Sequence, residues 1–304
     1  MIRTIYSTGE TVFDIIFKDS VPKTGNPGGS VLNSAVTLGR LGLSPVFLSD
    51  FCDDLIGKII ADFLSQNGVR VQKIINDEGK KTSIALAFLD SQGNAQYEFY
   101  KQKPSENQTN FNVDFKEDDI LLFGSFYGIM PEIRSSILRL LTLAKNNNAI
   151  IVYDPNFRKP HLKDLPRVLP YIIENIRFSD IVKGSDEDFS LIFSTQNDED
   201  TFEKLRQINP NAHLFYTKGK NGCSYSFKGE ILRFEVPKII PVSTIGAGDN
   251  FNAGIVAAVI RENITKKLLA SGLDKEMVSK IISLAVELSQ EVCMSQSNYI
   301  AKRF

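Results

Sequence analysis

The chain is poor in the residues that build disulfide frameworks and soft-metal sites. Its 304 residues include only three cysteines and two histidines. Cys52, Cys223 and Cys293 are far apart and form no Cys-x-x-Cys pair, which argues against a disulfide scaffold or a zinc site and favours a reducing compartment. His161 and His213 are too few for a histidine-rich metal site, and neither lies in a context that suggests a Ser–His–Asp triad.

Long apolar runs and an excess of one charge are also missing. No apolar stretch is long enough to cross a bilayer, and the first residues lack the basic-then-apolar order of a signal peptide. The 35 basic residues stand against 36 acidic ones, a formal net charge of −1. Such a balance creates no global field that would favour nucleic acid or an anionic membrane. We therefore expect a cytoplasmic protein with neither nucleic-acid nor membrane partners.

What the chain does contain is an alternation of strand-like and helix-like apolar patterns. Residues 120–123 and 150–153 are apolar throughout, as in parallel strands covered on both faces. The alternation predicts an α/β fold built from βαβ units. The strands expected in this way are residues 45–49, 83–90, 119–124, 149–154, 180–183 and 213–217, and the helices are residues 55–67, 133–146, 165–176 and 200–208.

Two regions break the alternation. Residues from about 5 to 27 and from about 84 to 103 have strand patterns without a long helix between them. In the second region, residues 85–89 and 96–100 form an expected hairpin with alternating polar and aromatic positions. We expect both regions to build a small β-sheet lid within a single domain spanning residues 1–304. An open lid edge leads to the hypothesis of a homodimer formed through the lid.

A glycine-rich segment, residues 243–254, carries the strongest chemical signal. Gly246, Ala247 and Gly248 stand directly before Asp249 and the start of an apolar helix. Small residues let the backbone approach a ligand, and a helix N-terminus binds anions. A phosphate cradle beside a carboxylate base is what phosphoryl transfer to a hydroxyl requires. The alternative is an ordinary glycine-rich turn with Asp249 as the helix cap.

A second glycine-rich segment lies near the N-terminus. Gly28 and Gly29 precede a helical pattern that contains Asn33, whose amide both donates and accepts hydrogen bonds. Upstream, Asp14 interrupts an apolar strand with a carboxylate, a group suited to accept hydrogen bonds from sugar hydroxyls. Taken singly, these residues also fit an ordinary helix start and an exposed strand position.

Together, the two glycine-rich segments resemble those of the ribokinase-like (PfkB-type) carbohydrate kinases, with fructokinases and 2-keto-3-deoxygluconate kinases most similar. Residues 28–42 match the family's N-terminal signature, and residues 243–254 match its C-terminal signature except at Ser243. Between them, residues 154–158 (Asp-Pro-Asn-Phe-Arg) and 217–222 (Thr-Lys-Gly-Lys-Asn-Gly) match two further motifs. The resemblance covers essentially the whole chain. It implies a three-layer α/β/α core with a mostly parallel central sheet and a small β-sheet lid.

The resemblance also implies an activity, ATP-dependent phosphorylation of a sugar hydroxyl, with a fructokinase-like substrate favoured. Asp249 would be the general base and the backbone of Gly246, Ala247 and Gly248 the anion hole. The implied sugar contacts are Asp14, Gly28, Gly29, Asn33, Tyr97 and Arg158. The implied ATP contacts are Lys183, Ser185, Thr217, Gly219 and Gly222, with Gly246 and Gly248. Mg²⁺ is expected as cofactor, with Asp188 acting on it through water.

The chain departs from the family pattern at three places. Ser243 replaces an aspartate that in the family helps bind an activating monovalent cation, which weakens the expectation of potassium activation. Residues 185–188 (Ser-Asp-Glu-Asp) stand where the family has Asn-x-x-Glu, so a shorter carboxylate is kept and an amide is lost. Residues 292–297 differ from the family near its nucleotide pocket, which makes the phosphate donor less secure than the base.

Several alternatives stay open at this point. Within the kinases, the acceptor could instead be 2-keto-3-deoxygluconate, ribose or a nucleoside. The altered residues 185–188 and 292–297 also fit a pseudokinase that binds a sugar or nucleotide without turnover. A nicotinamide-dependent dehydrogenase is disfavoured, because no G-x-G-x-x-G fingerprint follows the first strand.

Overall fold

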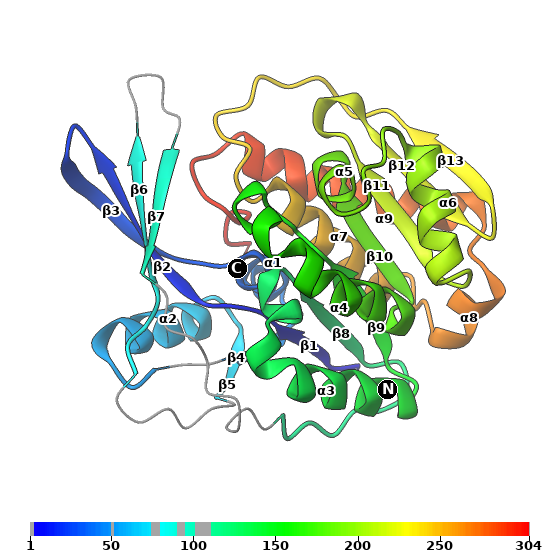
Figure 1. The fold of residues 1–304 in the computed structure, drawn as a ribbon, viewed down its shortest axis with the longest axis horizontal. Coiled ribbons are helices and arrows are strands. Elements are labelled where there is room, and N and C mark those ends of the chain that lie inside the picture. The colour runs from blue at the N-terminus through cyan, green and yellow to red at the C-terminus, as the bar shows by residue number, and fades with distance from the viewer. Residues whose placement is uncertain (1–2, 50–51, 74–79, 90–94, 101–110, 304) are drawn as a thin grey trace.

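A large mostly parallel sheet forms the centre of the molecule (Figure 1). The computed structural model describes residues 3–49, 52–73, 80–89, 95–100 and 111–303. The order of the nine strands is β13 (Glu230–Phe234), β12 (Cys223–Phe227), β11 (His213–Thr217), β10 (Ile181–Ser185), β9 (Ile150–Asp154), β8 (Ile120–Gly124), β1 (Ile5–Thr8), β4 (Val46–Ser49) and β5 (Arg70–Lys73). All neighbouring pairs from β11 to β5 are parallel, whereas the β11–β12 and β12–β13 pairs are antiparallel.

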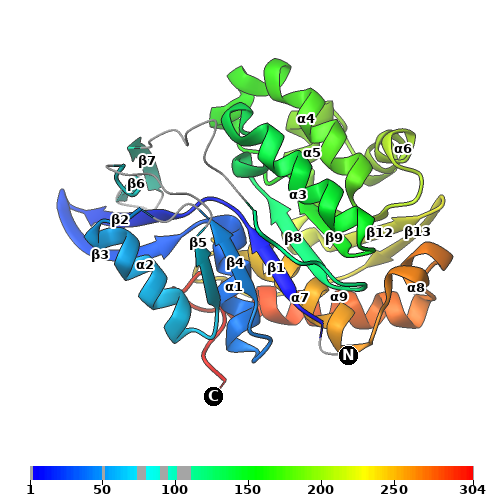
Figure 2. The same cartoon turned by 90° about the horizontal axis from the view of Figure 1, so that it is seen from below.

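Helices cover both faces of this sheet and give three layers (Figure 2). One face is covered by α3 (Arg134–Asn146), α4 (Leu165–Phe178), α5 (Asp186–Phe193) and α6 (Asp198–Ile208), and the other by α1 (Ser30–Arg40), α2 (Leu55–Gln66), α7 (Ala247–Arg261), α8 (Lys266–Ser271) and α9 (Lys275–Cys293). Short 3₁₀ turns lie at Phe126–Ile129, Pro131–Ile133, Lys159–Asp164 and Gly219–Asn221. None of the described helices has the length and hydropathy needed to cross a bilayer.

The central strands are buried on both faces, as their apolar sequences predict. Ile120 and Leu122 of β8 belong to the core beneath α1, α7 and α9, whereas Leu121 and Phe123 belong to the core beneath α3 and α4. Successive side chains of a strand point to opposite faces, so one apolar run serves two cores. The expected α/β/α core is therefore confirmed.

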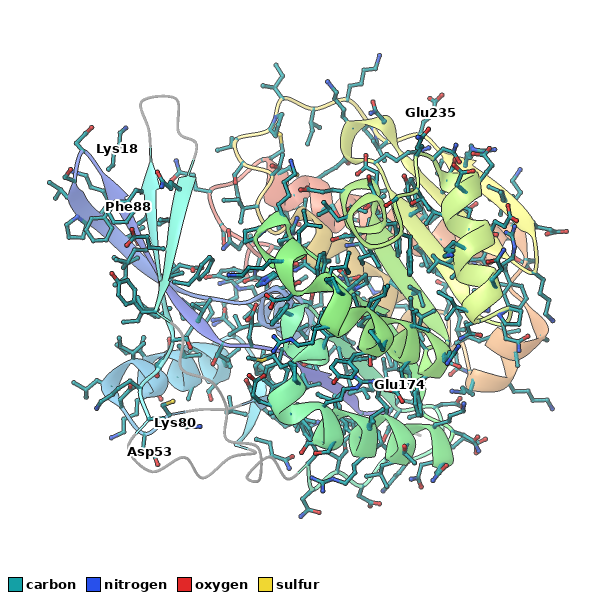
Figure 3. The ribbon with its side chains drawn as sticks, viewed as in Figure 1. Lys18, Asp53, Lys80, Phe88, Glu174 and Glu235 are labelled. Carbon is teal, nitrogen blue, oxygen red and sulfur yellow. The ribbon has the colours of Figure 1, made fainter. Side chains whose placement is uncertain are left out.

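A separate four-stranded sheet projects from one end of the core (Figure 1). Its order is β3 (Val21–Gly28), β2 (Val12–Lys18), β6 (Ile84–Leu89) and β7 (Ala95–Tyr100). The β2–β6 pair is parallel, and the β2–β3 and β6–β7 pairs are antiparallel. Figure 3 labels Lys18 and Phe88 on this sheet, which we call the lid sheet.

The lid sheet starts later in the chain than the sequence led us to expect. Residues 5–8 form β1, which lies in the central sheet between β8 and β4. Both edges of β1 are paired and most of its residues are buried, so this strand belongs to the core and the lid sheet starts at Val12. At the other end, β7 stops at Tyr100, and residues 101–103 of the expected lid lie outside the described residues.

Candidate active site

The candidate site lies where the carboxyl ends of the central strands meet the first turns of α1 and α7. Ligands of open α/β sheets bind at this edge. Asp154 ends β9, Ser185 ends β10 and Thr217 ends β11. The two glycine-rich segments predicted from the sequence precede α1 and α7. They meet through the contact of Ser30 with Asp249, and Gly248 lies close to Lys183 of β10.

The turn before α7 has a shape that only glycine permits. Gly246 is the helix cap with φ +81°, and a Cβ there would lie 2.6 Å from the carbonyl oxygen of Asn298. Asn250 Nδ2 closes the turn by donating to the carbonyl oxygens of Gly246 (2.7 Å) and Asn298 (2.8 Å). The first N–H groups of a helix lack helical partners and face an approaching anion. Ala247 N has a weak turn partner, the Thr244 oxygen at 3.3 Å.

The carboxylate of Asp249 is held by α1. Ser30 Oγ donates to Oδ1 at 2.6 Å, and Asn33 Nδ2 donates to Oδ2 at 2.8 Å. Burial raises the pKa of Asp249 above its ordinary value, because an ion is poorly solvated there. The hydrogen bonds from Asn33 and Ser30 and the charge of Lys183 lower the pKa again. The result is an oriented carboxylate that accepts a proton more readily than an exposed aspartate.

The predicted sugar contacts of the N-terminal motif come together beside this carboxylate. A Cβ on Gly28 would lie 2.2 Å from Asp14 Oδ2, so the lid carboxylate lies directly against the glycine pair. Gly29 has φ +133°, and a Cβ there would meet the Glu10 carbonyl oxygen at 2.3 Å. Asn33 Oδ1 is buried and has no hydrogen-bond partner among the described residues. A buried acceptor of this kind is costly unless a ligand supplies a donor.

A buried ion pair lies under the start of α7. Lys183 Nζ is 2.9 Å from Asp154 Oδ2, and both side chains are about 4% exposed. Asn252 Nδ2 donates to the same oxygen at 2.6 Å, and Asn156 N donates to Asp154 Oδ1 at 2.9 Å. A Cβ on Gly248 would lie 3.0 Å from Lys183 Nζ. The ammonium group therefore lies close to the backbone that is predicted to cradle a phosphate.

Ser185 and Asp188 begin α5 with a capping box. Asp188 Oδ2 accepts from Ser185 N (2.7 Å) and Ser185 Oγ (2.6 Å), whereas Oδ1 is buried without a partner among the described residues. Burial, and next the charge of Asp154, raise the pKa of Asp188 above its ordinary value, while Lys183 and Ser185 oppose this shift. The described residues contain no group of three or more His, Cys, Asp or Glu side chains that could ligate a metal directly.

The turn after β11 also depends on glycine. Lys218 N donates to the Gly222 carbonyl oxygen at 2.9 Å. Gly219 and Gly222 have φ of +53° and +93°, and a Cβ on Gly222 would meet the Phe234 carbonyl oxygen at 2.4 Å. This turn places Thr217 at the strand end, on the side of the sheet edge where Ser185 ends β10, because the two residues are direct partners.

Two predicted sugar contacts are not joined to the site by any described contact. Arg158 follows the Asp-Pro-Asn motif with an exposed side chain, and Tyr97 lies in β7 opposite Ala87, its side chain being outside the described part. Conversely, three residues that contact the predicted site residues were not predicted from the sequence, namely Ser30, Asn252 and Asp154. Asp154 lies in the Asp-Pro-Asn-Phe-Arg motif, whereas Ser30 and Asn252 have no signal beyond their places in the two glycine-rich segments.

Comparison with known proteins is consistent with this geometry. Residues 5–297 match the family described as pfkB family carbohydrate kinase. A fructokinase of Rhizobium leguminosarum bv. trifolii is 30% identical over 280 residues, which cover 90% of this chain and 84% of the relative.

Solved structures share the fold over nearly the whole chain. An uncharacterized sugar kinase of Pyrococcus horikoshii, solved in complex with ATP, has a TM-score of 0.79 at 21% identity and covers 98% of this chain and 95% of its own. Fructokinase of Vibrio cholerae O395, solved with fructose, ADP and calcium, has a TM-score of 0.77 at 19% identity and covers 98% and 94%. At such identities the likeness concerns the fold, and it is the match over residues 5–297 that identifies the chain as a member of the pfkB family of carbohydrate kinases.

Proposed function

We propose that this protein is an ATP-dependent sugar kinase that phosphorylates a primary hydroxyl, with fructose as the preferred acceptor. The observation that carries the proposal is the Asp249 carboxylate, which α1 holds beside the glycine turn at the start of α7. The fructokinase relative and the ATP-bound and fructose-bound neighbours support the choice of donor and acceptor. A cytoplasmic location is part of the same proposal.

The reaction is an in-line transfer. Asp249 takes the proton from the sugar hydroxyl, whose oxygen then forms a bond to the γ-phosphorus of ATP. The bond from that phosphorus to the oxygen bridging to the β-phosphate breaks, and ADP leaves with that bond's electron pair. The backbone of residues 246–248 stabilises the transferring phosphoryl group, and removing one such donor typically costs about 2.7–4 kcal/mol of barrier. Lys183, close to Gly248, adds positive charge at this point.

The sugar lies between the lid sheet and α1 in this proposal. Asn33 links the base to the sugar site, because its Nδ2 donates to Asp249 and its buried Oδ1 is available to accept a hydrogen bond from a sugar hydroxyl. Asp14, next to Gly28 and Gly29, accepts hydrogen bonds from further hydroxyls of the sugar. Tyr97 and Arg158 are proposed to complete the pocket when the lid closes and excludes water, which would otherwise compete as phosphoryl acceptor.

The nucleotide is proposed to lie along the ends of β10 and β11, against Lys183, Ser185, Thr217 and the turn containing Gly219 and Gly222. Asp188 is suited to hold a cation through water, because its Oδ1 is buried without a hydrogen-bond partner among the described residues. A nearby positive charge also stabilises its ionised form, as Lys183 does. When bound, Mg²⁺ would neutralise charge between the terminal phosphates. Asp188 alone does not make a direct ligand set.

The proposal is tested by ADP release measured across a panel of fructose, 2-keto-3-deoxygluconate, ribose and a nucleoside. We expect turnover with fructose to exceed that with the other three. Preference for another member of the panel would reassign the acceptor and keep the kinase. Binding of sugar and ATP without turnover, in protein shown to be folded by circular dichroism, would defeat the proposal and favour the pseudokinase that the altered residues 185–188 first suggested.

A further inference from the structure

One face of α1 carries a row of polar side chains where an apolar helix face is expected. Ser30, Asn33, Ser34 and Thr37 recur at helical spacing and meet the first turn of α7. Ser34 and Thr37 are 1% and 0% exposed. Buried polar groups destabilise a protein unless they are hydrogen-bonded, so the contacts of this row explain its presence.

The members of the row contact different atoms of α7. Ser34 Oγ donates to the main-chain oxygen of Asp249 at 2.7 Å, and Thr37 Oγ1 donates to Asn250 Oδ1 at 2.5 Å. Only Ser30 and Asn33 reach the Asp249 carboxylate, and they bind one oxygen each. Asn33 also has an acceptor available to the sugar, whereas the Ser30 contact involves the base alone.

We infer that Ser30 is a positioning residue, whose hydroxyl holds the Asp249 carboxylate in the orientation and the ionised state that proton abstraction requires. This inference rests on the proposed function. A hydroxyl–carboxylate bond of 2.6 Å lies in the short range of charge-assisted hydrogen bonds, which are roughly twice as strong as neutral ones. Ser30 is the first residue of α1, directly after Gly29, so it ties the orientation of the base to the glycine pair beside Asp14.

The ionisation of Asp249 depends on a balance of neighbours. Burial and the charge of Asp154 favour the protonated acid, and Asn33, Ser30 and Lys183 favour the carboxylate. Removing the Ser30 hydroxyl takes away one group that stabilises the ion, so the pKa of Asp249 rises. Asp249 is then protonated, and unable to act as the base, at a higher pH than in the parent. A hydroxyl that only supported the fold would leave the pKa unchanged.

The test compares Ser30→Ala with two matched variants of the same helix. Ser30→Thr restores a hydroxyl that can donate to Asp249. Ser34→Ala makes the same chemical change but removes a bond to the main chain instead of the carboxylate. For each variant, kcat/KM is measured from pH 5 to pH 9 with the best sugar of the panel. At low pH, kcat/KM falls as Asp249 becomes protonated, and we call this fall the acid limb of the profile. We expect the acid limb of Ser30→Ala to lie about one pH unit higher than that of the parent, and kcat to fall about tenfold. Ser30→Thr should return toward the parent profile, and Ser34→Ala should leave the limb in place.

A direct titration separates this inference from the proposed function. The ¹³C carboxyl resonance of Asp249, assigned by its loss in Asp249→Asn, reports the ionisation without turnover. We expect it to titrate at higher pH in Ser30→Ala than in the parent protein. Equal titration in both, or an equal shift in Ser34→Ala, would overturn the inference even for an active kinase. If the parent protein turns over no sugar, the proposed function fails while the titration still decides the role of Ser30.

Discussion

At the residue scale, the chemistry depends on a few side chains that come from distant parts of the chain. Asp249 meets Ser30 and Asn33 across α1 and α7, and Lys183 meets Asp154 across neighbouring strands. The sequence predicted Asp249, Asn33 and the glycines, because each lies in a local motif with its own chemistry. It could not predict the partner of Lys183, since that contact depends on β9 and β10 being neighbours in the sheet.

The Lys183–Asp154 pair leads to a prediction about stability. Lys183→Met leaves the Asp154 carboxylate buried without its cation, and breaking such a pair typically costs about 3–5 kcal/mol. The double variant Lys183→Met/Asp154→Asn removes both charges and keeps an acceptor for Asn252 but not for Asn156 N, so it should regain part of that loss. Urea unfolding of the three proteins measures both effects. A single variant within about 1 kcal/mol of the parent would contradict a buried, essential pair.

At the element scale, helix and strand types followed from local pattern, whereas membership of a sheet did not. Residues 5–8 and 12–18 both have strand sequences with no long helix between them, yet β1 lies in the central sheet and β2 in the lid sheet. The difference arises from partners far along the chain, namely β8 and β4 for β1 and β6 for β2. Nothing in the sequence of residues 5–8 or 12–18 predicts which strands they will pair with.

His213 joins three elements at the end of the sheet opposite the site. Its Nε2 donates to the Leu269 carbonyl oxygen of α8 (2.9 Å), so Nδ1 accepts from Tyr225 of β12 (2.6 Å), and its ring stacks on Phe227 at 4.1 Å. Burial lowers the pKa of His213 to about 4. Because the ordinary pKa is about 6.5, the unfolded chain takes up this proton first.

Stability should therefore fall in acid. The contribution of neutral His213 is complete above about pH 6.5 and is lost as the pH falls from there to about 4, by up to about 3 kcal/mol. His213→Phe should be less stable at pH 7, because Tyr225 and Leu269 lose a partner, but its unfolding free energy should depend less on pH. Parallel pH curves for the parent and His213→Phe would refute this account.

At the scale of the whole molecule, the proposed site is composite, because the core would supply Asp249 and the lid sheet Asp14. Phe17 and Phe88 stack at 4.9 Å on the face of the lid sheet opposite Asp14. Phe88, labelled in Figure 3, is 37% exposed, and Tyr100 is 61% exposed. Exposed apolar side chains on an open sheet are typical of an interface. The homodimer through the lid, expected from the sequence on the ground of an open sheet edge, stays a prediction, and this face is where we expect it to form.

The dimer is testable by light scattering on the eluted protein. We expect the parent to have the mass of two chains and Phe88→Lys to have the mass of one, because a charge on this face opposes burial. Leu55→Lys, the same kind of change at a 78% exposed position of α2, should leave the mass unchanged. A parent that stays monomeric at high concentration would rule out the lid dimer.

The most direct test of the whole account is the product formed from ATP and fructose by the parent and by Asp249→Asn, followed by ³¹P NMR. Loss of a general base typically lowers the rate by about 10²–10⁴-fold. We predict a sugar phosphate with the parent, at least about a hundredfold less with Asp249→Asn, and fructose affinity within about tenfold between the two by calorimetry. A kcat of Asp249→Asn above about a tenth of the parent value would contradict the role of Asp249 as the base.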